Sequence, residues 1–179
     1  MASEEYRRIG RNLIAKGSIL DYYQDDIELP DGSVSKWDFI DHKGAAAALP
    51  VLPDGRILMV RQYRSALDRY TLEIPAGGLK NRNERRLTAA KRELQEETGY
   101  KAGKMELLIR INTTVAFCNE RIDIFLATDL IPGKQHLDPD EFLRVEAHPL
   151  DKLLEMIYKG KLMDSKTVSA ILAYRNKLG

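Results

Sequence analysis

The sequence predicts an α/β fold in which a mixed sheet lies between layers of helix. Segments with the composition of strands stand on both sides of one amphipathic segment at residues 84–98. Two further helical segments close the chain, at 150–158 and 165–177. Strands that flank a mid-chain helix, followed by helices at the end, are typical of a sheet packed between helical layers.

The first part of the chain, residues 1–43, has the composition of short strands joined by turns. Pro-Asp-Gly at 30–32 is a strong turn signal, because proline presets a turn backbone and glycine accepts a positive φ. We therefore expect residues 19–29 and 33–42 to pair as antiparallel strands.

A small apolar run follows at 44–51, and a second Pro-Asp-Gly, at 53–55, turns the chain again. We expect residues 56–63 to form the other arm of a hairpin with this run. A short extended segment at 71–75 then leads into Ala-Gly-Gly at 76–78.

One helix is predicted at 84–98, after a loop at 79–83 that has no apolar period. Its apolar stripe follows the helical spacing i, i+3, i+7 at Leu87, Ala90 and Leu94. Gly99 stands where many helices end in a left-handed glycine. The rest of the chain contains, in order, strands at 104–112 and 121–128, a loop at 129–141, a strand at 142–148 and the two closing helices.

At 179 residues, the chain is long enough for one domain with a small extra layer. The net charge of +1 gives no signal for nucleic acid, and no apolar run approaches the ~20 residues that span a bilayer. The single cysteine, Cys118, cannot form an intramolecular disulfide, and the three histidines lack zinc-ligand spacing. With a charged N-terminal segment that has no apolar secretory core, these features predict a soluble cytoplasmic protein without nucleic-acid or membrane partners.

Three carboxylates, Glu93, Glu96 and Glu97, stand within one turn of the predicted helix. Spacings of three and four residues place them on one face, where like charges repel and weaken a bare helix. A solvated acidic face is the simple interpretation of such a cluster. The alternative is a site for a hard divalent cation such as Mg²⁺, which binds carboxylate oxygens and pairs them with substrate phosphates.

The residues around these carboxylates form a long, gapped pattern. Gly78 is followed after five residues by Glu84, and after seven more by Arg-Glu-Leu-Gln-Glu-Glu-Thr-Gly at 92–99. This pattern resembles the Nudix box, the signature of hydrolases that cut diphosphates linked to another group. Tyr100 stands where the family usually has an aliphatic residue. The resemblance implies the Nudix α/β/α sandwich with a mixed sheet, accompanied here by a small N-terminal antiparallel strand region.

The resemblance also implies roles for the charged residues of the helix. Glu93 and Glu97 are implied to bind the metal ion, Mg²⁺ or alternatively Mn²⁺, with support from Glu96. Arg92 is implied to orient a glutamate of the helix, and Glu84 to support the same acidic surface. Glu96, Glu97 and Arg92 are therefore candidate catalytic residues.

Two further positions follow from the same resemblance. A backbone carbonyl before the helix is the family's neutral metal ligand, and here Ala76 or Gly77 occupies that position. An acidic residue on a late loop approaches the attacking water in the family and can serve as general base. Glu141 is the implied base in this chain, with Asp140 as the second choice. An ordinary acidic turn is the alternative interpretation of 138–141.

From residue 29 to 128 the chain is similar to the ADP-ribose pyrophosphatase branch of the family, notably in Val-Arg-Gln-Tyr-Arg at 60–64. This likeness implies that Arg64 reaches the diphosphate or terminal ribose of the substrate, a task that suits the planar guanidinium fork. Trp37, the only tryptophan, is implied to stack on the base, and a core or interface tryptophan is the alternative. Glu120 is implied to take part in substrate binding.

The branch implies a homodimer, in which the strand region at 1–43 pairs or swaps with a second subunit and the hydrolase domain occupies 44–179. The implied reaction is Mg²⁺-dependent hydrolysis of a nucleoside diphosphate sugar, first of all ADP-ribose to AMP and ribose 5-phosphate. One departure leaves the sugar open. Thr-Thr-Val-Ala at 113–116 lacks the proline that ADP-ribose-specific members usually carry.

Three alternatives remain open from the sequence. The first is hydrolysis of GDP-mannose, another nucleotide sugar or an oxidised nucleotide on the same scaffold. The second is a non-catalytic Nudix domain that senses a nucleotide, although sensors typically lose one of the glutamates that this chain retains. The third is a hydrolase directed at RNA 5′ caps, for which the cluster of Arg82, Arg85 and Arg86 gives no extended basic surface.

Overall fold

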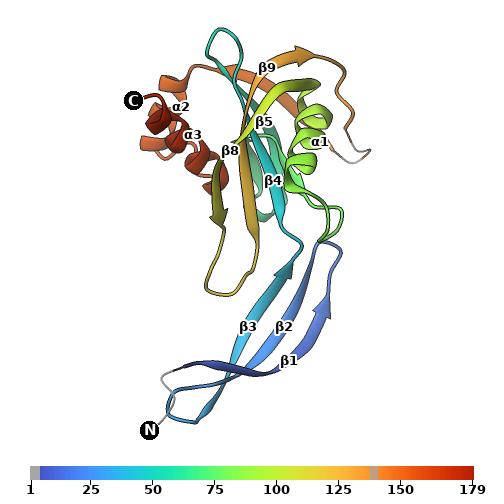
Figure 1. The fold of residues 1–179 in the computed structure, drawn as a ribbon, viewed down its shortest axis with the longest axis vertical. Helices are drawn as coiled ribbons and strands as arrows, with labels where there is room; N and C mark the ends of the chain where they lie inside the picture. Colours follow the sequence, from blue (N-terminus) through green and yellow to red (C-terminus); the bar gives the residue numbers. More distant parts are fainter. Residues whose placement is uncertain (1–4, 138, 140) are drawn as a thin grey trace. The chain divides into compact units, whose positions relative to one another are not determined.

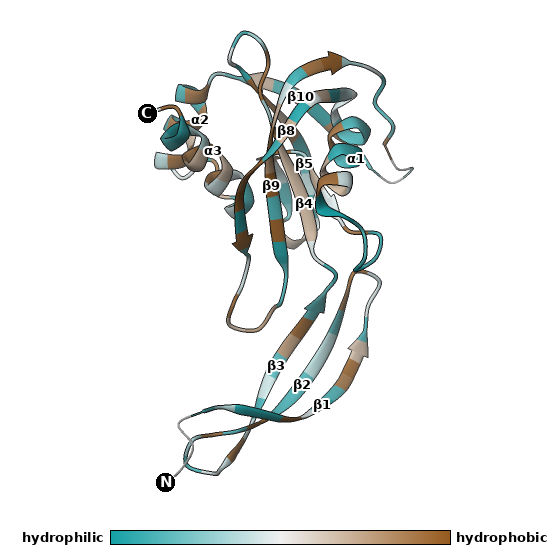
Figure 2. Ribbon diagram, viewed as in Figure 1, coloured by the Kyte–Doolittle hydropathy of each residue, from teal (hydrophilic) through white to brown (hydrophobic). Residues whose placement is uncertain are grey.

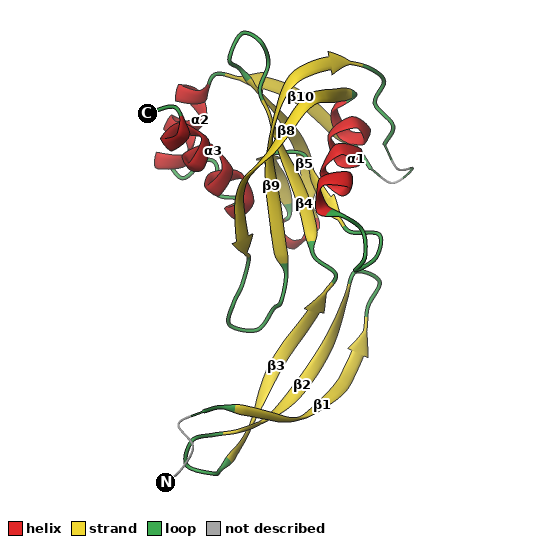
Figure 3. Cartoon of the chain, in the orientation of Figure 1, coloured by secondary structure: helices red, strands yellow, loops and turns green. Residues whose placement is uncertain are grey.

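The computed structural model describes residues 5–137, 139 and 141–179. By their contacts, the described residues fall into two compact units, of which the first comprises 5–44 with 112–120. The second comprises the described part of 45–111 with 121–179. All the α-helices among the described residues belong to the second unit (Figure 3).

The first unit is built on an antiparallel sheet in the order β1-β2-β3, made by β1 (Arg7–Lys16), β2 (Leu20–Glu28) and β3 (Val34–His42). The predicted pairing of the two strands around Pro-Asp-Gly is confirmed, and Gly32 takes a left-handed conformation with φ 83°. β1 adds a third strand, which the sequence patterns did not single out.

A buried carboxylate is accommodated in β2 by an arginine from β1. Arg11 donates from Nε and Nη2 to the two carboxylate oxygens of Asp25, at 2.6 Å each, and these bonds lower the pKa of Asp25. The same guanidinium lies 3.7 Å from the ring centre of Phe39 on β3. One side chain therefore ties the three strands together.

The second unit contains a four-stranded mixed sheet in the order β7-β4-β9-β8. Its central strand, β4 (Ala45–Pro50), runs antiparallel to β7 (Ala76–Gly78) and parallel to β9 (Arg121–Pro132). β8 (Tyr100–Asn112) completes the sheet next to β9. The mixed sheet predicted from the sequence is thus confirmed.

A separate three-stranded sheet of this unit has the order β10-β5-β6. It consists of β5 (Ile57–Arg64), β6 (Arg69–Glu73) and β10 (Leu143–His148), all antiparallel, with a short 3₁₀ turn, η1 (Ser65–Leu67), between β5 and β6. β5 is the central strand, so both of its edges are hydrogen-bonded to a neighbour.

The predicted hairpin between 44–51 and 56–63 is wrong. The two segments share only one isolated bridge, between Val51 and Ile57, before β4 and β5 enter different sheets. The physical reason lies in burial. Every residue of β4 is buried, so this strand is covered on both faces, and it pairs with two distant strands rather than with its neighbour in sequence.

Helices cover both faces of the mixed sheet. In Figure 1, α1 (Arg86–Thr98) lies on one side of β4 and β9, whereas α2 (Leu150–Tyr158) and α3 (Ser165–Lys177) lie on the other. Successive side chains of a strand point to opposite faces. Alternate residues of β4 accordingly join different cores. One core contains Ala45, Ala47 and Leu49 with residues of α2 and α3, and the others contain Ala46 and Ala48 with residues of α1.

The helix boundaries agree closely with the sequence patterns. α1 begins two residues later than predicted and ends as expected at Gly99, which has φ 77° and donates its N–H to the carbonyl of Gln95 at 2.9 Å. Asp164 caps α3 by accepting from the N–H of Thr167. α1 is mostly hydrophilic in Figure 2. No helix in the described part of the chain is long and apolar enough to cross a membrane.

Candidate active site

The acidic residues of α1 are divided between its buried and its exposed sides. Glu93 and Glu97 are buried, and Glu96 is partly exposed. Ala89, Ala90 and Leu94 pack the same helix onto the sheet, so the inner face of α1 carries both the apolar contacts and two carboxylates. A solvated acidic face therefore does not describe Glu93 and Glu97.

Arg92 holds the exposed edge of this acidic group. Its Nη1 donates to Glu93 Oε1 at 2.5 Å and to Glu96 Oε2 at 3.1 Å. Its Nη2 donates to the carbonyl of Gly78 at 3.2 Å, and its Nε lies 3.4 Å from Glu84 Oε1. One guanidinium thus binds three carboxylates and the loop before the helix, which fixes their orientation and offsets part of their repulsion. Its predicted catalytic role stays a prediction.

The backbone of β7 lies directly against the buried carboxylates. A Cβ added to Gly77 would stand 2.2 Å from Cδ of Glu93, so any other residue here would require this carboxylate to move. A backbone hydrogen bond from Ala76 favours the charged form of Glu97 and partly offsets the rise in its pKa. Gly78 differs, because a Cβ there would meet nothing within 4 Å. The structure thus brings Ala76 and Gly77 together with Glu93 and Glu97.

The acidic groups of Glu93, Glu97 and Glu141 influence one another at this site. Burial, followed by the charges of Glu93 and Glu141, raises the pKa of Glu97 to about 9. Burial also raises the pKa of Glu93, although Arg92 partly offsets it. Glu97 Oε2 is buried and has no hydrogen-bond partner among the described residues. An unpaired, buried carboxylate oxygen is a donor type that a hard divalent cation binds.

The described part of the chain contains no group of three or more His, Cys, Asp or Glu side chains arranged to hold a metal ion. The donors in this region that fit a cation are the two buried carboxylates, Glu93 and Glu97, against which the backbone of Gly77 lies. Such a small set suits Mg²⁺, which keeps several water ligands and binds few protein groups.

The late acidic loop contributes Glu141, which stands just before β10. Its charge raises the pKa of both Glu93 and Glu97, and its predicted role as a general base stays a prediction. Gln62 on β5 approaches it, with Nε2 3.4 Å from Oε1. Asp140, the second choice for a base, lies outside the described residues.

Arg64 is held by a carboxylate that the sequence analysis missed. It donates from Nε and Nη2 to the two oxygens of Glu73, at 2.8 and 2.6 Å. Glu73 also accepts from Lys166 Nζ and, at 2.6 Å, from Thr71 Oγ1. The Arg64 side chain is 40% exposed, whereas that of Glu73 is 3% exposed. A glutamate between Leu72 and Ile74, within the short extended segment at 71–75, was the available signal.

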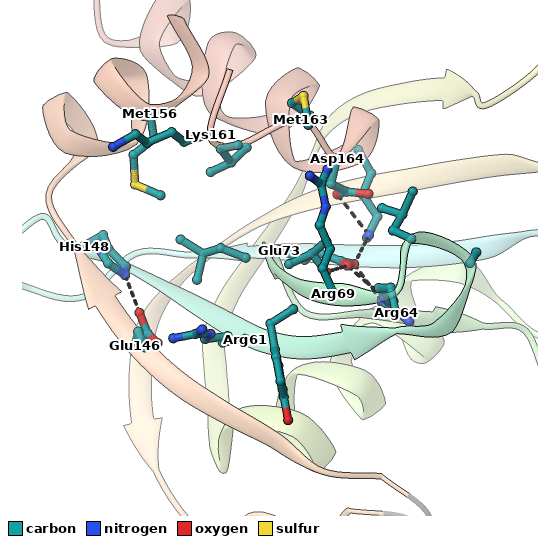
Figure 4. A pocket seen from close by; sticks show the side chains of 17 residues that line it. Arg61, Arg64, Arg69, Glu73, Glu146, His148, Met156, Lys161, Met163 and Asp164 are labelled. Carbon is teal, nitrogen blue, oxygen red and sulfur yellow. Dashed lines mark hydrogen bonds and ion pairs between the residues drawn. The ribbon is translucent and has the colours of Figure 1, made fainter. Parts of the chain in front are cut away.

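A cavity of about 730 Å³ opens beside Arg64 (Figure 4). It lies against the edge strand β6 and the segment that joins α2 to α3. Its charged lining comprises Arg61, Arg64, Arg69, Lys161 and Lys166 with Glu73, Glu146 and Asp164. The cations outnumber the acids, and the volume lies within the usual range for small-molecule sites, about 300–1,000 Å³.

Trp37 and Glu120 belong to the first unit. Trp37 is 45% exposed on β3, with its ring centre 5.6 Å from that of Tyr6. Glu120 accepts from Thr113 Oγ1 at 2.9 Å and lies 3.4 Å from Nδ1 of His42. Their roles in substrate binding stay predictions.

The buried ion cluster of Glu73, Arg64 and Lys166 is expected to stabilise the fold in a way that depends on pH. Burial alone would raise the pKa of Glu73, but hydrogen bonds from Arg64 and Lys166 and the charge of Lys166 lower it from 4.5 to about 2. Because the folded-state pKa is lowered, the cluster stabilises the fold above pH 4.5, and this contribution is lost as the pH falls towards 2. We expect Glu73→Gln to reduce the unfolding free energy by about 3 kcal/mol at pH 7, and by far less as the pH approaches 2.

Urea unfolding of the wild type and of Glu73→Gln, at several pH values from 7 towards 2, measures this difference in unfolding free energy. A difference that stays constant over the whole range would show that the charge of Glu73 does not stabilise the fold.

Known proteins are similar to this chain over most of its length. Residues 41–168 match the family described as NUDIX domain. The ADP-ribose pyrophosphatase of Bacillus subtilis (strain 168) is 40% identical over 173 residues, which cover 96% of this chain and 93% of that protein. The methanol dehydrogenase activator of Bacillus methanolicus is 38% identical, over 93% of this chain and 91% of its own length.

Among solved structures, the crystal structure of an ADP compounds hydrolase is similar with a TM-score of 0.85 and 21% sequence identity. The similarity covers 97% of this chain and 94% of that one. At this level of identity the likeness shows the fold, and the α/β/α sandwich predicted from the sequence is confirmed.

Proposed function

The chain belongs to the Nudix family of hydrolases, and we propose that it hydrolyses the diphosphate of a nucleoside diphosphate sugar, first of all ADP-ribose to AMP and ribose 5-phosphate. The observation that carries this proposal is the convergence of two buried carboxylates, Glu93 and Glu97, on the backbone of Ala76 and Gly77. A buried and partly unpaired acidic pair is costly to the fold, and metal binding explains why it is kept.

A divalent cation, Mg²⁺ or Mn²⁺, is the proposed cofactor. Glu93 and Glu97 would hold it, with Glu96 in support and a carbonyl of Ala76 or Gly77 as the neutral ligand. When bound, such an ion neutralises the diphosphate oxygens and lowers the pKa of water enough to make it a nucleophile.

The remaining steps belong to side chains of this protein. Glu141 accepts the proton of the attacking water, whose oxygen forms a bond to one phosphorus atom. The bond between that phosphorus and the bridging oxygen breaks, and the bridging oxygen leaves with the other phosphate group. Arg64 donates to the diphosphate oxygens, and Arg92 keeps Glu93 and Glu96 oriented throughout.

ADP-ribose is favoured because the Bacillus subtilis relative, similar over nearly its full length, is named for that reaction. The Bacillus methanolicus relative is named for activating another enzyme, so its name specifies no substrate. The charge of the cavity beside Arg64 supports a doubly negative diphosphate substrate. GDP-mannose remains the alternative, because the stretch at 113–116 has no proline.

A coupled phosphate-release assay tests the proposed function. The purified protein is given ADP-ribose, GDP-mannose, UDP-glucose, NADH or a nucleoside triphosphate with Mg²⁺, and phosphatase is added to release phosphate from the products. We expect ADP-ribose to give the highest kcat/KM, and chelation of the metal to abolish activity. Preference for another nucleotide sugar would replace the substrate, whereas tight binding without cleavage would assign the protein to the nucleotide sensors.

We also propose a homodimer and a cytoplasmic location. Several large apolar side chains of the first unit are exposed, which supports burial against a second copy: Ile9, Leu13, Ile14, Val34 and Trp37. A single cysteine suits a reducing compartment. The mass of the protein in solution tests the dimer, and a monomer at all concentrations would remove the cross-subunit role proposed for Trp37.

A further inference from the structure

Lys166 is an almost fully buried cation in the first turn of α3. Its side chain is 11% exposed, and its ammonium group contacts two carboxylates, Glu73 and Asp164. The bond to Glu73 joins residues 93 positions apart in the sequence. A buried ammonium without partners would be strongly unfavourable, so Lys166 depends on Glu73 of β6 and on Asp164 at the start of α3.

Glu73 connects Lys166 to Arg64. The carboxylate receives four donors, from Arg64 Nε, Arg64 Nη2, Lys166 Nζ and Thr71 Oγ1. Its orientation is therefore set from several directions at once. Figure 4 shows Arg64 and Glu73 joined at the edge of the cavity. Within the described residues, Arg64 Nη1 has no hydrogen-bond partner, which leaves one side of the guanidinium for an anion.

The first turn of α3 is itself held firmly in place. Asp164 accepts from the N–H of Thr167 at 3.1 Å and from Lys166 Nζ at 3.0 Å. Thr167 is fully buried, and its Oγ1 accepts from the N–H of Ile74 at 3.0 Å. The first turn of α3 thus binds two successive residues. Lys166 contacts the side chain of Glu73, and Thr167 contacts the backbone of Ile74. Glu73 and Ile74 both lie immediately before the segment that carries Ala76 and Gly77.

We propose that Lys166 is a positioning residue for Arg64, which it acts on through the shared carboxylate of Glu73. This inference rests on the proposed function, in which Arg64 binds the substrate diphosphate. With Lys166 in place, Glu73 is fixed from α3 and holds the guanidinium with Nη1 directed outward. Without it, the carboxylate loses its anchor on α3, and Arg64 follows the carboxylate away from the position that binds the diphosphate.

The proposal predicts a specific kinetic effect of Lys166→Met. Arg64 contacts the diphosphate before and during the reaction, so its misplacement weakens binding of substrate and transition state alike. We expect KM for ADP-ribose to rise about tenfold with kcat within about twofold of the wild type. Lys166→Arg, which restores a cation, is expected to recover most of the lost affinity.

A double-mutant cycle with Arg64→Ala separates positioning from a general structural role. If Lys166 acts through Arg64, Lys166→Met changes kcat/KM about tenfold in the wild type and less than twofold in the Arg64→Ala background. An equal loss in both backgrounds would overturn the proposal, as would an unchanged KM in the single variant.

Lys177→Met is the matched control. Lys177 lies on the same helix, undergoes the same chemical change and loses an ion pair to Glu106, but it does not line the cavity. We expect its KM to stay within twofold of the wild type, and an effect as large as that of Lys166→Met would overturn the proposal. If Lys166→Met does not fold, Lys166→Gln, which keeps a hydrogen-bond donor, takes its place in the cycle.

The outcome is distinguishable from failure of the proposed function. Cleavage of ADP-ribose by the wild-type protein is measured first, and its absence refutes the proposed reaction alone. The same cycle is then completed with the Kd for ADP-ribose, measured by calorimetry. The positioning role is supported if Lys166→Met lowers the affinity for ADP-ribose in the wild type but not in the Arg64→Ala background. It is overturned if the wild type does not bind ADP-ribose.

Discussion

Replacement of Glu97 by glutamine is expected to abolish hydrolysis and, in the absence of metal, to stabilise the fold. The substitution removes a proposed metal ligand, and metal ions contribute several kcal/mol to such reactions, so we expect kcat/KM to fall about 10³-fold or more. The same carboxylate is buried beside Glu93 and Glu141 and has one unpaired oxygen. The raised pKa keeps Glu97 protonated in the metal-free fold at pH 7, whereas the same carboxyl is ionised in the unfolded chain. Glutamine is neutral in both states and removes this cost, which we expect to raise the unfolding free energy by about 1–2 kcal/mol.

Thermal unfolding with and without Mg²⁺ measures both effects. The metal-free variant is expected to melt several degrees above the metal-free wild type, by about 2–4 °C per kcal/mol. Added Mg²⁺ should raise the Tm of the wild type and leave that of the variant nearly unchanged, because a ligand stabilises only the state that binds it. Glu106→Gln changes a partly exposed glutamate paired with Lys177 and serves as the control. A variant with full activity would remove Glu97 from the metal site.

Gly77→Ala is expected to remove most of the activity, and Gly78→Ala to preserve it. The added methyl group would stand 2.2 Å from the carboxylate carbon of Glu93, so this carboxylate must move and lose its bond to Arg92. Displacement of a reacting group by about 1 Å can cost roughly 10²-fold in rate, and we expect a loss of that order. The atoms in conflict belong to the end of a flexible side chain, so the stability of the fold should change little.

Gly78→Ala is a matched control, because its methyl group meets nothing within 4 Å. The comparison requires kcat/KM and Tm for both variants, each measured with saturating Mg²⁺. Equal activities would show that the close approach of Gly77 to Glu93 has no part in the reaction. Loss of activity together with a large fall in Tm would point instead to a damaged loop.

Much of the fold followed from local sequence patterns. The helical spacing of apolar residues and the terminal Gly99 predicted α1 to within two residues at its start, and α2 and α3 were predicted with their observed bounds. Sequence patterns predict helices well because the hydrogen bonds and the apolar stripe of a helix involve residues close together in the chain. The hairpin proposed between 44–51 and 56–63 failed for the opposite reason, since strand partners are chosen by burial across the whole molecule.

The sequence by itself determined the family, the acidic face of α1 and the chemistry that such a face can support, because all of these depend on residues close together in the chain. Only the tertiary structure decided which carboxylates are buried, that Gly77 lies against Glu93, and that Glu73 joins Arg64 to Lys166. These features arise where segments distant in sequence pack together, and the free energy of a buried charge depends on partners that no local pattern specifies.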